Sequence, residues 1–153
     1  MTFAQDHLDI LYLAVGVSIA RAIESKLNID VGLKWPNKVT LRNKVVSIYS
    51  IETLKETGNN TIYKVRVLLN LYSSSEGLGG LEISLATEVG SIIIEWSSLA
   101  NELINEINEA VQDLREGITS KFVIEYLRRL ASLGEEVQAV SDLAIHLNNF
   151  NHF

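Results

Sequence analysis

The sequence predicts an α+β fold in which a small antiparallel sheet packs with three helices. Short runs rich in Val, Ile and Thr alternate with turn residues between about residues 31 and 72. Apolar residues recur every three or four positions at about 7–27, 98–115 and 120–132, and a further strand is expected at about 136–146. The 153 residues suffice for one domain with a core of its own.

The first helix is predicted to be amphipathic, because its apolar positions recur at intervals of three and four residues. Asp6 is a suitable N-cap for it, since a carboxylate accepts hydrogen bonds from the first unpaired backbone N–H groups. The following segment, 30–37, reads as a short strand that ends at Pro36, because proline cannot donate to a strand ladder.

The next strands are predicted to form a hairpin. The runs KVTL and KVVSIYSIE flank Arg42 and Asn43, which fit a tight two-residue turn. Residues 53–60 are polar and are predicted to be a loop. The run Thr61–Tyr72 alternates and then becomes continuously apolar, which is typical of a central antiparallel strand.

The second half is predicted to be mainly helical. After the Gly- and Ser-rich stretch 73–80, residues 81–89 fit a strand or a helix, and their periodicity does not decide between the two. Ser98 is a suitable cap for the second helix and Gly117 a suitable end, while Gly134 should end the third. The inward residues of the second helix are expected to be Leu99, Leu103, Ile104, Ile107, Val111 and Leu114. Those of the third are expected to be Phe122, Val123, Tyr126, Leu127 and Leu130.

Composition excludes several classes of function. The chain has no cysteine, so it has no thiol nucleophile, disulfide framework or thiolate metal site, and its three histidines show no ligand spacing. With no signal-peptide pattern and no apolar run near the roughly 18 residues of a membrane span, a cytoplasmic protein is expected. Residues 1–80 carry nine Lys/Arg against seven Asp/Glu, whereas residues 81–153 carry four against twelve.

The segment LKWPNKVTLRNKVVSI, residues 33–48, carries four basic residues and no acid. These are Lys34, Lys38, Arg42 and Lys44. The pattern fits a working site, the remnant of one, or a solvated hairpin. Four positive charges would also give salt-dependent, non-specific affinity for nucleic acid, but the chain is acidic overall and shows no recognition helix.

The stretch GLKWPNKV, followed by Lys44 and VVSI, resembles biotin protein ligases, which carry a Lys-Trp-Pro-Asn-Asp strand end, a hairpin and a Lys-(Leu/Ile)-Ala-Gly-Ile strand. YKVRVLLNLY is similar to their Gly-Ile-Gly-Ile-Asn-Val-Asn strand, and FVIEYLRRLASLGEEVQAV to their last helix and Leu-Gly-Lys-x-Val strand. The resemblance covers about residues 8–140. It implies a partial catalytic domain at 1–134 and a remnant of the C-terminal barrel, or a tail, at 135–153.

The resemblance implies roles for six residues. Lys44 matches the family lysine that contacts biotin and the reacting carboxyl and phosphate groups, so it would be catalytic in an active enzyme. The remnant of the biotin and ATP site would comprise Lys34, Trp35, Asn37, Ser47 and Asn70. Trp35 also fits a core residue, and Asn37 a turn residue that bonds its own backbone. Biotin, ATP and Mg would be the cofactors, and no residue is assigned as a metal ligand.

The sequence departs from the family pattern at the ligand-facing positions. Lys38 replaces the acid after Asn37, and Ser47 replaces a glycine. Arg66 and Leu68 stand where the family has two glycines that let the ligand approach the backbone. The family's Gly-Arg-Gly-Arg-x-Gly motif, which shields the reactive adenylate from water, does not occur in these 153 residues.

We therefore expect a truncated, degenerate biotin ligase-like protein that does not ligate biotin alone. It would act through self-association or through a partner or small ligand, with a homodimer or partner chain covering the exposed sheet face. One alternative is a ligase, or a split-ligase subunit, that adenylates biotin with ATP and transfers it to a lysine of a biotin acceptor domain. Another is an anion- or nucleic-acid-binding module that uses the basic hairpin.

Overall fold

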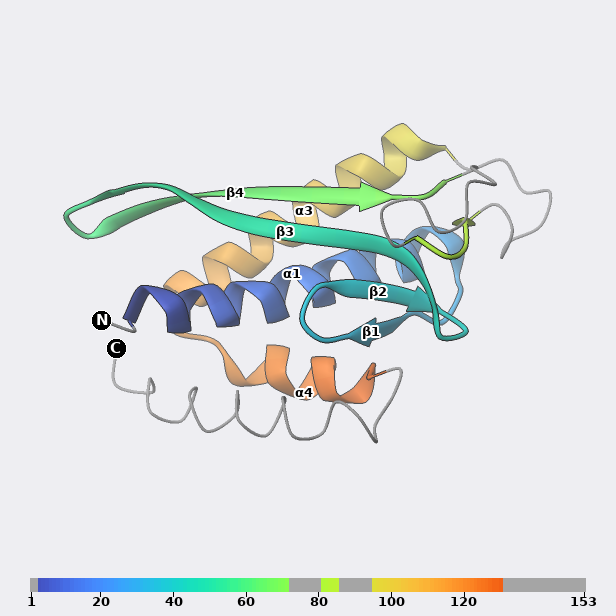
Figure 1. Ribbon diagram of the computed structural model, residues 1–153, viewed down its shortest axis with the longest axis horizontal. Helices are drawn as coiled ribbons and strands as arrows, with labels where there is room; N and C mark the ends of the chain where they lie inside the picture. Colours follow the sequence, from blue (N-terminus) through green and yellow to red (C-terminus); the bar gives the residue numbers. More distant parts are fainter. Residues whose placement is uncertain (1–2, 72–80, 86–94, 131–153) are drawn as a thin grey trace.

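The computed structural model describes residues 3–71, 81–85 and 95–130 and has an α+β fold (Figure 1). Its elements are α1 (Phe3–Leu27), β1 (Gly32–Lys34), β2 (Lys38–Leu41), β3 (Lys44–Thr57), β4 (Asn60–Leu69), α3 (Trp96–Arg115) and α4 (Ser120–Arg128). The strands form one antiparallel sheet in the order β1-β2-β3-β4. The predicted class, a small antiparallel sheet with three helices, is confirmed. The strand predicted at 136–146 and the division at residue 134 lie outside the described residues.

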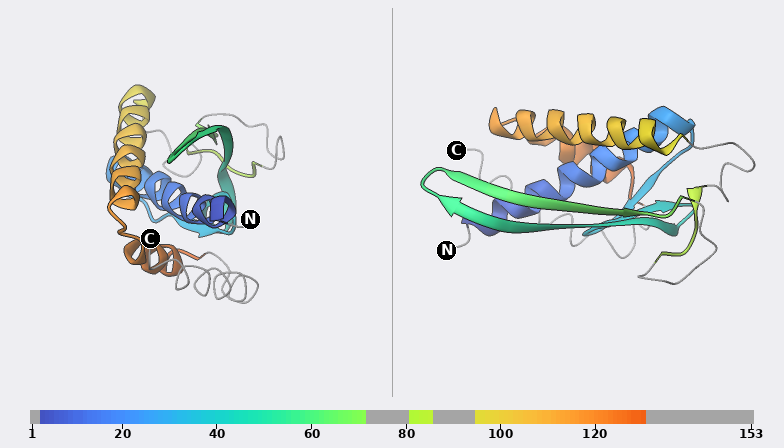
Figure 2. Two further views of the ribbon diagram at one scale, coloured as in Figure 1. Left: turned by 90° about the vertical axis from the view of Figure 1, so that its left-hand side faces the viewer. Right: turned by 90° about the horizontal axis from the view of Figure 1, so that it is seen from above.

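Helix α1 forms the centre of the molecule, with the sheet against one side and α3 and α4 against the others (Figure 2). Its residues 13–20 are all buried, so every face of this stretch is covered. The predicted amphipathic helix is therefore wrong here, because a helix covered all round carries apolar or small residues on every face. The helix also begins at Phe3, so Asp6 is not its N-cap. Although α1 is long, neither it nor any other helix in the described part is long and apolar enough to cross a membrane.

The turn between β2 and β3 is formed by Arg42 and Asn43, as predicted. Both residues have positive φ, 49° and 65°, which is the backbone conformation that lets a two-residue turn match the twist of the flanking strands.

Strands β3 and β4 form a ribbon that runs toward the end of the molecule where α1 begins (Figure 1). The loop predicted at 53–60 is wrong, because these residues belong to the ribbon except for a two-residue turn at Gly58 and Asn59. Gly58 supplies the positive φ of 56° that this turn needs. The prediction of a central strand is also wrong, since β4 lies at an edge of the described sheet.

Helix α3 begins at Trp96, so Ser98 lies within its first turn and does not cap it. The predicted end is confirmed. The helix stops at Arg115, and Gly117 follows at φ 79°, where its N–H bonds the Leu114 carbonyl at 3.0 Å. Ile104 was predicted to face inward but is exposed.

Helix α4 begins at Ser120, as predicted, and ends at Arg128. Phe122 and Tyr126, one turn apart, are buried against the core, but Leu127 is exposed because it lies on a different face from Tyr126. The helix therefore ends before the end predicted near residue 132, and the stop predicted at Gly134 lies outside the described residues.

Candidate functional site

The turn between β1 and β2 contains Trp35, Pro36 and Asn37 and is held in place by Tyr49 of β3. The Tyr49 N–H donates to the Asn37 carbonyl oxygen at 3.1 Å. Its hydroxyl shares its proton between two acceptors, the carbonyl oxygens of Tyr12 at 2.7 Å and of Pro36 at 3.1 Å. Burial raises the pKa of Tyr49 well above its ordinary value, so the phenol keeps its proton and stays a donor.

Trp35 is partly buried and packs against the core rather than standing out from the turn. Its ring meets the ring of Tyr126 edge to face, with centroids 5.9 Å apart and planes at 79°. This is a favourable arrangement for two aromatic rings inside a core. The geometry supports the interpretation of Trp35 as a core residue.

Lys34 and Lys44 lie at opposite ends of β2. Lys34 pairs with Lys38 at the start of β2, whereas Lys44 pairs with Leu41 at its end. Along the strands, the two lysine Cα atoms are offset by about 10 Å. Across the sheet they are two strand spacings apart, which is again about 10 Å. Lys44 is exposed and Lys34 is partly buried. The register therefore does not bring the two lysines side by side.

Ser47 and Asn70 do come together, but inside the fold. Ser47 is 0% exposed, and its hydroxyl donates to the Leu68 carbonyl oxygen at 2.9 Å. Asn70 is 5% exposed, and its side-chain amide donates to the Ile83 carbonyl oxygen at 3.2 Å. The Asn70 backbone N–H bonds the carbonyl of Val46, the residue before Ser47. Both side chains are thus engaged by the protein's own backbone.

The segment Leu81–Leu85 closes over this position. The N–H groups of Glu82 and Ile83 donate to the Val45 carbonyl oxygen at 2.7 and 3.1 Å, and the Glu82 carboxylate accepts from the Val45 N–H at 3.0 Å. The apolar residues of the segment, Leu81, Ile83 and Leu85, are buried. Residues 81–84 form neither a strand nor a helix, and 86–89 lie outside the described residues. Sequence reasoning missed this role, although the apolar alternation was visible.

Arg66 and Leu68 stand on the face of β4 that points away from the core. Burial alternates along β4, with Val65 and Val67 packed against the core and the intervening residues exposed. Leu68, for example, is 51% exposed. The two positions that correspond to family glycines therefore carry side chains over the outer face of the sheet.

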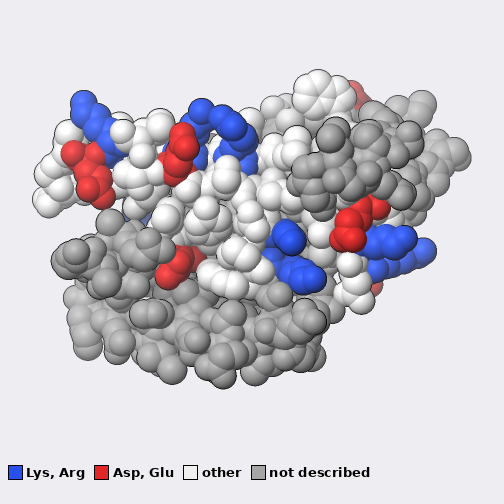
Figure 3. All heavy atoms as spheres, in the orientation of Figure 1, with Lys and Arg blue, Asp and Glu red and all other residues white. Residues whose placement is uncertain are grey.

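The basic hairpin does not form one continuous patch. Its four basic residues divide into two pairs at the two ends of β2, Lys34 with Lys38 and Arg42 with Lys44. On the face shown in Figure 3, Lys and Arg side chains lie in separate groups, several of them beside acidic side chains. Within the described ranges, no three His, Cys, Asp or Glu residues gather as a metal site would require.

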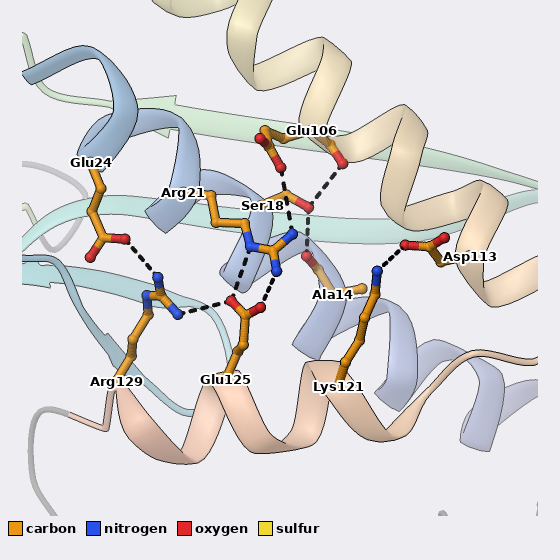
Figure 4. A network of polar contacts seen from close by, with 9 residues as sticks. All are labelled: Ala14, Ser18, Arg21, Glu24, Glu106, Asp113, Lys121, Glu125 and Arg129. Carbon is orange, nitrogen blue, oxygen red and sulfur yellow. Dashed lines mark hydrogen bonds and ion pairs between the residues drawn. The ribbon is translucent and has the colours of Figure 1, made fainter.

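An ionic network that the sequence did not reveal links the three helices (Figure 4). Arg21 of α1 donates from Nε to Glu125 of α4 at 3.0 Å and also pairs with Glu125 through Nη2. Arg129 donates to Glu125 at 3.0 Å and to Glu24 of α1 at 2.6 Å. Arg21 lies 3.9 Å from Glu106 of α3. Only the pair Glu125 and Arg129 has a spacing visible in the sequence, four residues apart, whereas the bonds to Arg21, Glu24 and Glu106 join separate helices and have no such signal.

The network shifts two pKa values in opposite directions. Burial alone would raise the pKa of Glu125, but the hydrogen bonds and charges of Arg21 and Arg129 outweigh it and lower that pKa. Burial raises the pKa of Glu106 despite the nearby Arg21 charge. Both carboxylates thus act as structural partners of the arginines.

A hollow of about 980 Å³ lies where the end of α1, the start of β1, the β2–β3 turn and the end of α4 meet. It is lined by Glu24, Asn28, Ile29, Asp30, Val31, Gly32, Thr40, Arg42, Asn43, Arg128, Arg129 and Leu130. None of the six residues assigned to the candidate biotin and ATP site lines it.

No protein-family model matches the chain, and no curated protein sequence matches it. Its structure is similar to biotin protein ligase from Aquifex aeolicus. The complex with biotin and ATP has a TM-score of 0.64 and 22% identity, with 80% of this chain and 51% of that chain covered. The apo structure has a TM-score of 0.66 and 22% identity, with 82% and 55% covered.

This chain therefore spans about half the length of those ligases. At this identity the likeness shows the fold alone, and that fold is part of the biotin protein ligase fold.

Proposed function

We propose that this chain is a cytoplasmic biotin protein ligase-like protein that does not ligate biotin by itself. It acts through self-association or through binding of a partner or small ligand. The observation that carries the proposal is the burial of Ser47 and Asn70, whose side chains are hydrogen-bonded to backbone carbonyls. A ligand at this position would have to replace those bonds and displace the segment Leu81–Leu85.

The residues present do not fit biotin and its adenylate. Family glycines leave room for a ligand against the backbone. Here Arg66 and Leu68 project from the outer face, and the Ser47 side chain fills the space that a glycine would leave open. Lys38 adds positive charge where the family has an acid near the nucleotide phosphate and its magnesium. We therefore derive no ligation step from this site.

The alternative is a ligase or a split-ligase subunit, and one observation favours it. Lys44 is exposed, so its ammonium group remains available to a ligand. As a point charge it would orient the biotin carboxylate and stabilise negative charge that develops on it. Lys34 and Asn37 would then support the nucleotide from the other end of β2.

Self-association is supported by the ribbon of β3 and β4. Among the described residues, no strand pairs with the outer edge of β4. Leu54 and Ile62, near the tip of the ribbon, are both exposed. A free edge invites pairing with another strand, and a two-stranded ribbon alone is marginally stable in water. A homodimer or a partner chain at this edge would cover it.

The first test is calorimetric titration with biotin and with a non-hydrolysable biotinyl-adenylate analogue, in the presence of magnesium. We expect no heat of binding in the wild type. Micromolar or tighter binding that is lost in Lys44→Ala, but kept in the control Lys64→Ala, would overturn the proposal and support the ligase. Lys64 is a suitable control because it is an exposed strand lysine on β4.

The self-association arm is tested by sedimentation velocity over a range of protein concentrations. We expect a dimer that Ile62→Lys weakens. Ile124→Lys is the matched control, because Ile124 is similarly exposed but lies on α4. A monomer at every concentration, or equal effects of both variants, would exclude the β4 edge as the contact.

A further inference from the structure

The backbone groups along the free edge of β4 follow from its pairing with β3. Asn70, directly after β4, donates its N–H to the Val46 carbonyl oxygen of β3 at 3.0 Å. In an antiparallel ladder, the N–H and C=O of one residue point to the same side, and that side alternates along the strand. The even-numbered residues of β4 therefore face β3, whereas the odd-numbered ones, such as Tyr63, direct their N–H and C=O toward the free edge. Among the described residues, no strand pairs with that edge.

The side chains of β4 alternate between the core and the outer face of the sheet. On the core side they are only partly buried, and on the outer face they are exposed. A strand added at the free edge would therefore cover more of the core-side residues, which include Tyr63 and Val65. The outer face carries Lys64 and Arg66, and β4 has no acidic residue. Charge thus limits which strand can be added and in which register.

A second copy of this chain is the occupant that this edge favours. Lys64 already has an acid as its direct cross-strand neighbour, Glu52 of β3, so it needs no acid from an added strand. Two copies of β4 related by a twofold axis would pair antiparallel, make every contact twice and close the free edge of each copy. The tip of the ribbon reaches beyond the helices, so pairing at the tip keeps the bodies of the two copies apart (Figure 2).

Like charges restrict the register of two paired β4 strands. When a twofold axis keeps outer face beside outer face, one residue of β4 lies opposite its own copy. With the axis at Lys64 or at Arg66, that cation opposes itself. With the axis at Val65, Lys64 opposes Arg66 twice. Like charges directly opposite each other destabilise a sheet, so these registers are disfavoured.

The registers on either side of these differ in length. With the axis at Val67, the ladder is limited to residues 65–69, because beyond them the Asn70 carbonyl oxygen already accepts from the Leu85 N–H at 2.9 Å. With the axis at Tyr63, residues 60–66 pair with their own copy, and all of them lie in β4. An axis still nearer to the turn shortens the ladder. Tyr63 is therefore the axis that gives the longest ladder without opposed cations.

We propose that two copies of this chain join by antiparallel pairing of residues 60–66 of β4, with the twofold axis at Tyr63. The proposal rests on the self-association proposed above and adds the contact and its register. Arg66 then lies opposite Asn60 of the second copy, whose amide oxygen is a suitable acceptor for a guanidinium. Lys64 lies opposite Ile62 of the second copy, so its aliphatic stem packs against an apolar side chain.

Disulfide cross-linking tests the register directly, because the chain has no cysteine of its own. In Tyr63→Cys the two thiols lie across a hydrogen-bonded pair with Cα atoms about 5.5 Å apart, which is within disulfide range. In Val65→Cys the same atoms are offset by about 14 Å along the strands. We expect oxidation to give a covalent dimer of Tyr63→Cys and none of Val65→Cys, as measured by non-reducing electrophoresis and mass spectrometry.

A mixture of two variants tests the same register with Tyr63 in place. Thr61 lies opposite Val65 of the second copy, so oxidation of Thr61→Cys mixed with Val65→Cys should give the mixed covalent dimer. Neither variant alone should link to itself. The mixture reports the register even where the loss of the tyrosine weakens the dimer.

Position 62 tests the charges across the axis. Ile62→Lys would set like charges opposite Lys64 twice in one dimer, whereas Ile62→Glu would set opposite charges there. We expect Ile62→Glu to dimerise about tenfold or more tightly than Ile62→Lys in sedimentation velocity. The difference should shrink at high salt. Equal dissociation constants for the two variants would overturn the proposal.

The register and the self-association fail separately. A dimer in sedimentation that yields no mixed covalent dimer, or that links through Val65→Cys by itself, would overturn the register and leave self-association standing. A monomer at every protein concentration would overturn both and leave the edge of β4 to a different partner.

Discussion

Gly16, in the middle of α1, is the position where one added methyl group should be most damaging. A Cβ at this residue would lie 2.5 Å from the hydroxyl oxygen of Tyr49 and 3.4 Å from Cε2 of Tyr126. The first distance is too short for any real contact, so Tyr49 would have to move. That movement would break the bonds of its hydroxyl to the carbonyls of Tyr12 and Pro36. Gly16→Ala therefore acts on the turn that carries Trp35 and Asn37.

Three opposing terms set the size of the effect. Alanine is better than glycine inside a helix by about 1 kcal/mol. Overpacking a well-filled core costs about 1–3 kcal/mol. A buried hydroxyl that loses its partners costs about a further 1–3 kcal/mol. The sum predicts that Gly16→Ala lowers the free energy of unfolding by about 3 kcal/mol. Helix propensity alone would have raised this free energy.

Urea denaturation of four proteins measures this effect: wild type, Gly16→Ala, Tyr49→Phe and the double variant. Removing the Tyr49 hydroxyl removes the atom that the new methyl group would meet, so the alanine should cost little in the Phe background. We expect a coupling free energy of at least about 2 kcal/mol between the two positions. A coupling below about 0.5 kcal/mol would refute the contact as the cause.

Two other substitutions test the polar contacts. Glu125→Gln should lose less stability than the wild type when the pH is lowered. Arg21 and Arg129 hold the pKa of Glu125 below its ordinary value of 4.5, so its contribution is present above that pH and lost as the pH falls through the lowered folded value. The urea midpoints of the wild type and of Glu125→Gln, measured from about pH 6 to about pH 3, should approach each other as the pH falls. Midpoints that stay equally far apart would contradict this. Asn70→Ala should lower the free energy of unfolding in urea by about 2–4 kcal/mol, because it leaves the Ile83 carbonyl unpaired and opens a cavity. A loss below about 0.5 kcal/mol would contradict the pairing.

Local signals in the sequence predicted those parts of the fold that depend on local geometry. Arg42-Asn43 was recognised as a turn because Asn tolerates positive φ between two strand-forming runs. The ribbon was missed because both of its faces meet solvent over residues 53–62. A strand exposed on both faces has no hydrophobic alternation, so its polar sequence cannot be told from a loop. Only Gly58 marked where the chain turns.

The resemblance to biotin protein ligases identified the candidate site residues but not their surroundings. Burial of Ser47 and Asn70 depends on where the segment Leu81–Leu85 packs, and its apolar alternation gave no partner for it. The hollow where the end of α1, the start of β1 and the end of α4 meet was missed for a related reason. Glu24, Thr40 and Arg129 come from three elements far apart in the chain, so no spacing marks them as neighbours.

The bulge in the pairing of β2 with β3 lies beside the closed ligase-like position. Val39 pairs with Ser47 but Thr40 pairs with Val45, so one residue of β3 is left over between them. Buried backbone groups need partners. The Val46 carbonyl accepts from the Asn70 N–H, and the Val45 carbonyl accepts from the segment Leu81–Leu85.

Those contacts bury Ser47 and Asn70. The Val45 and Val46 carbonyls are thus paired by the segment Leu81–Leu85 and by Asn70, and these bonds hold the two side chains inside the fold. A ligand at the ligase-like position would have to break them, which is the reason to expect no binding of biotin there.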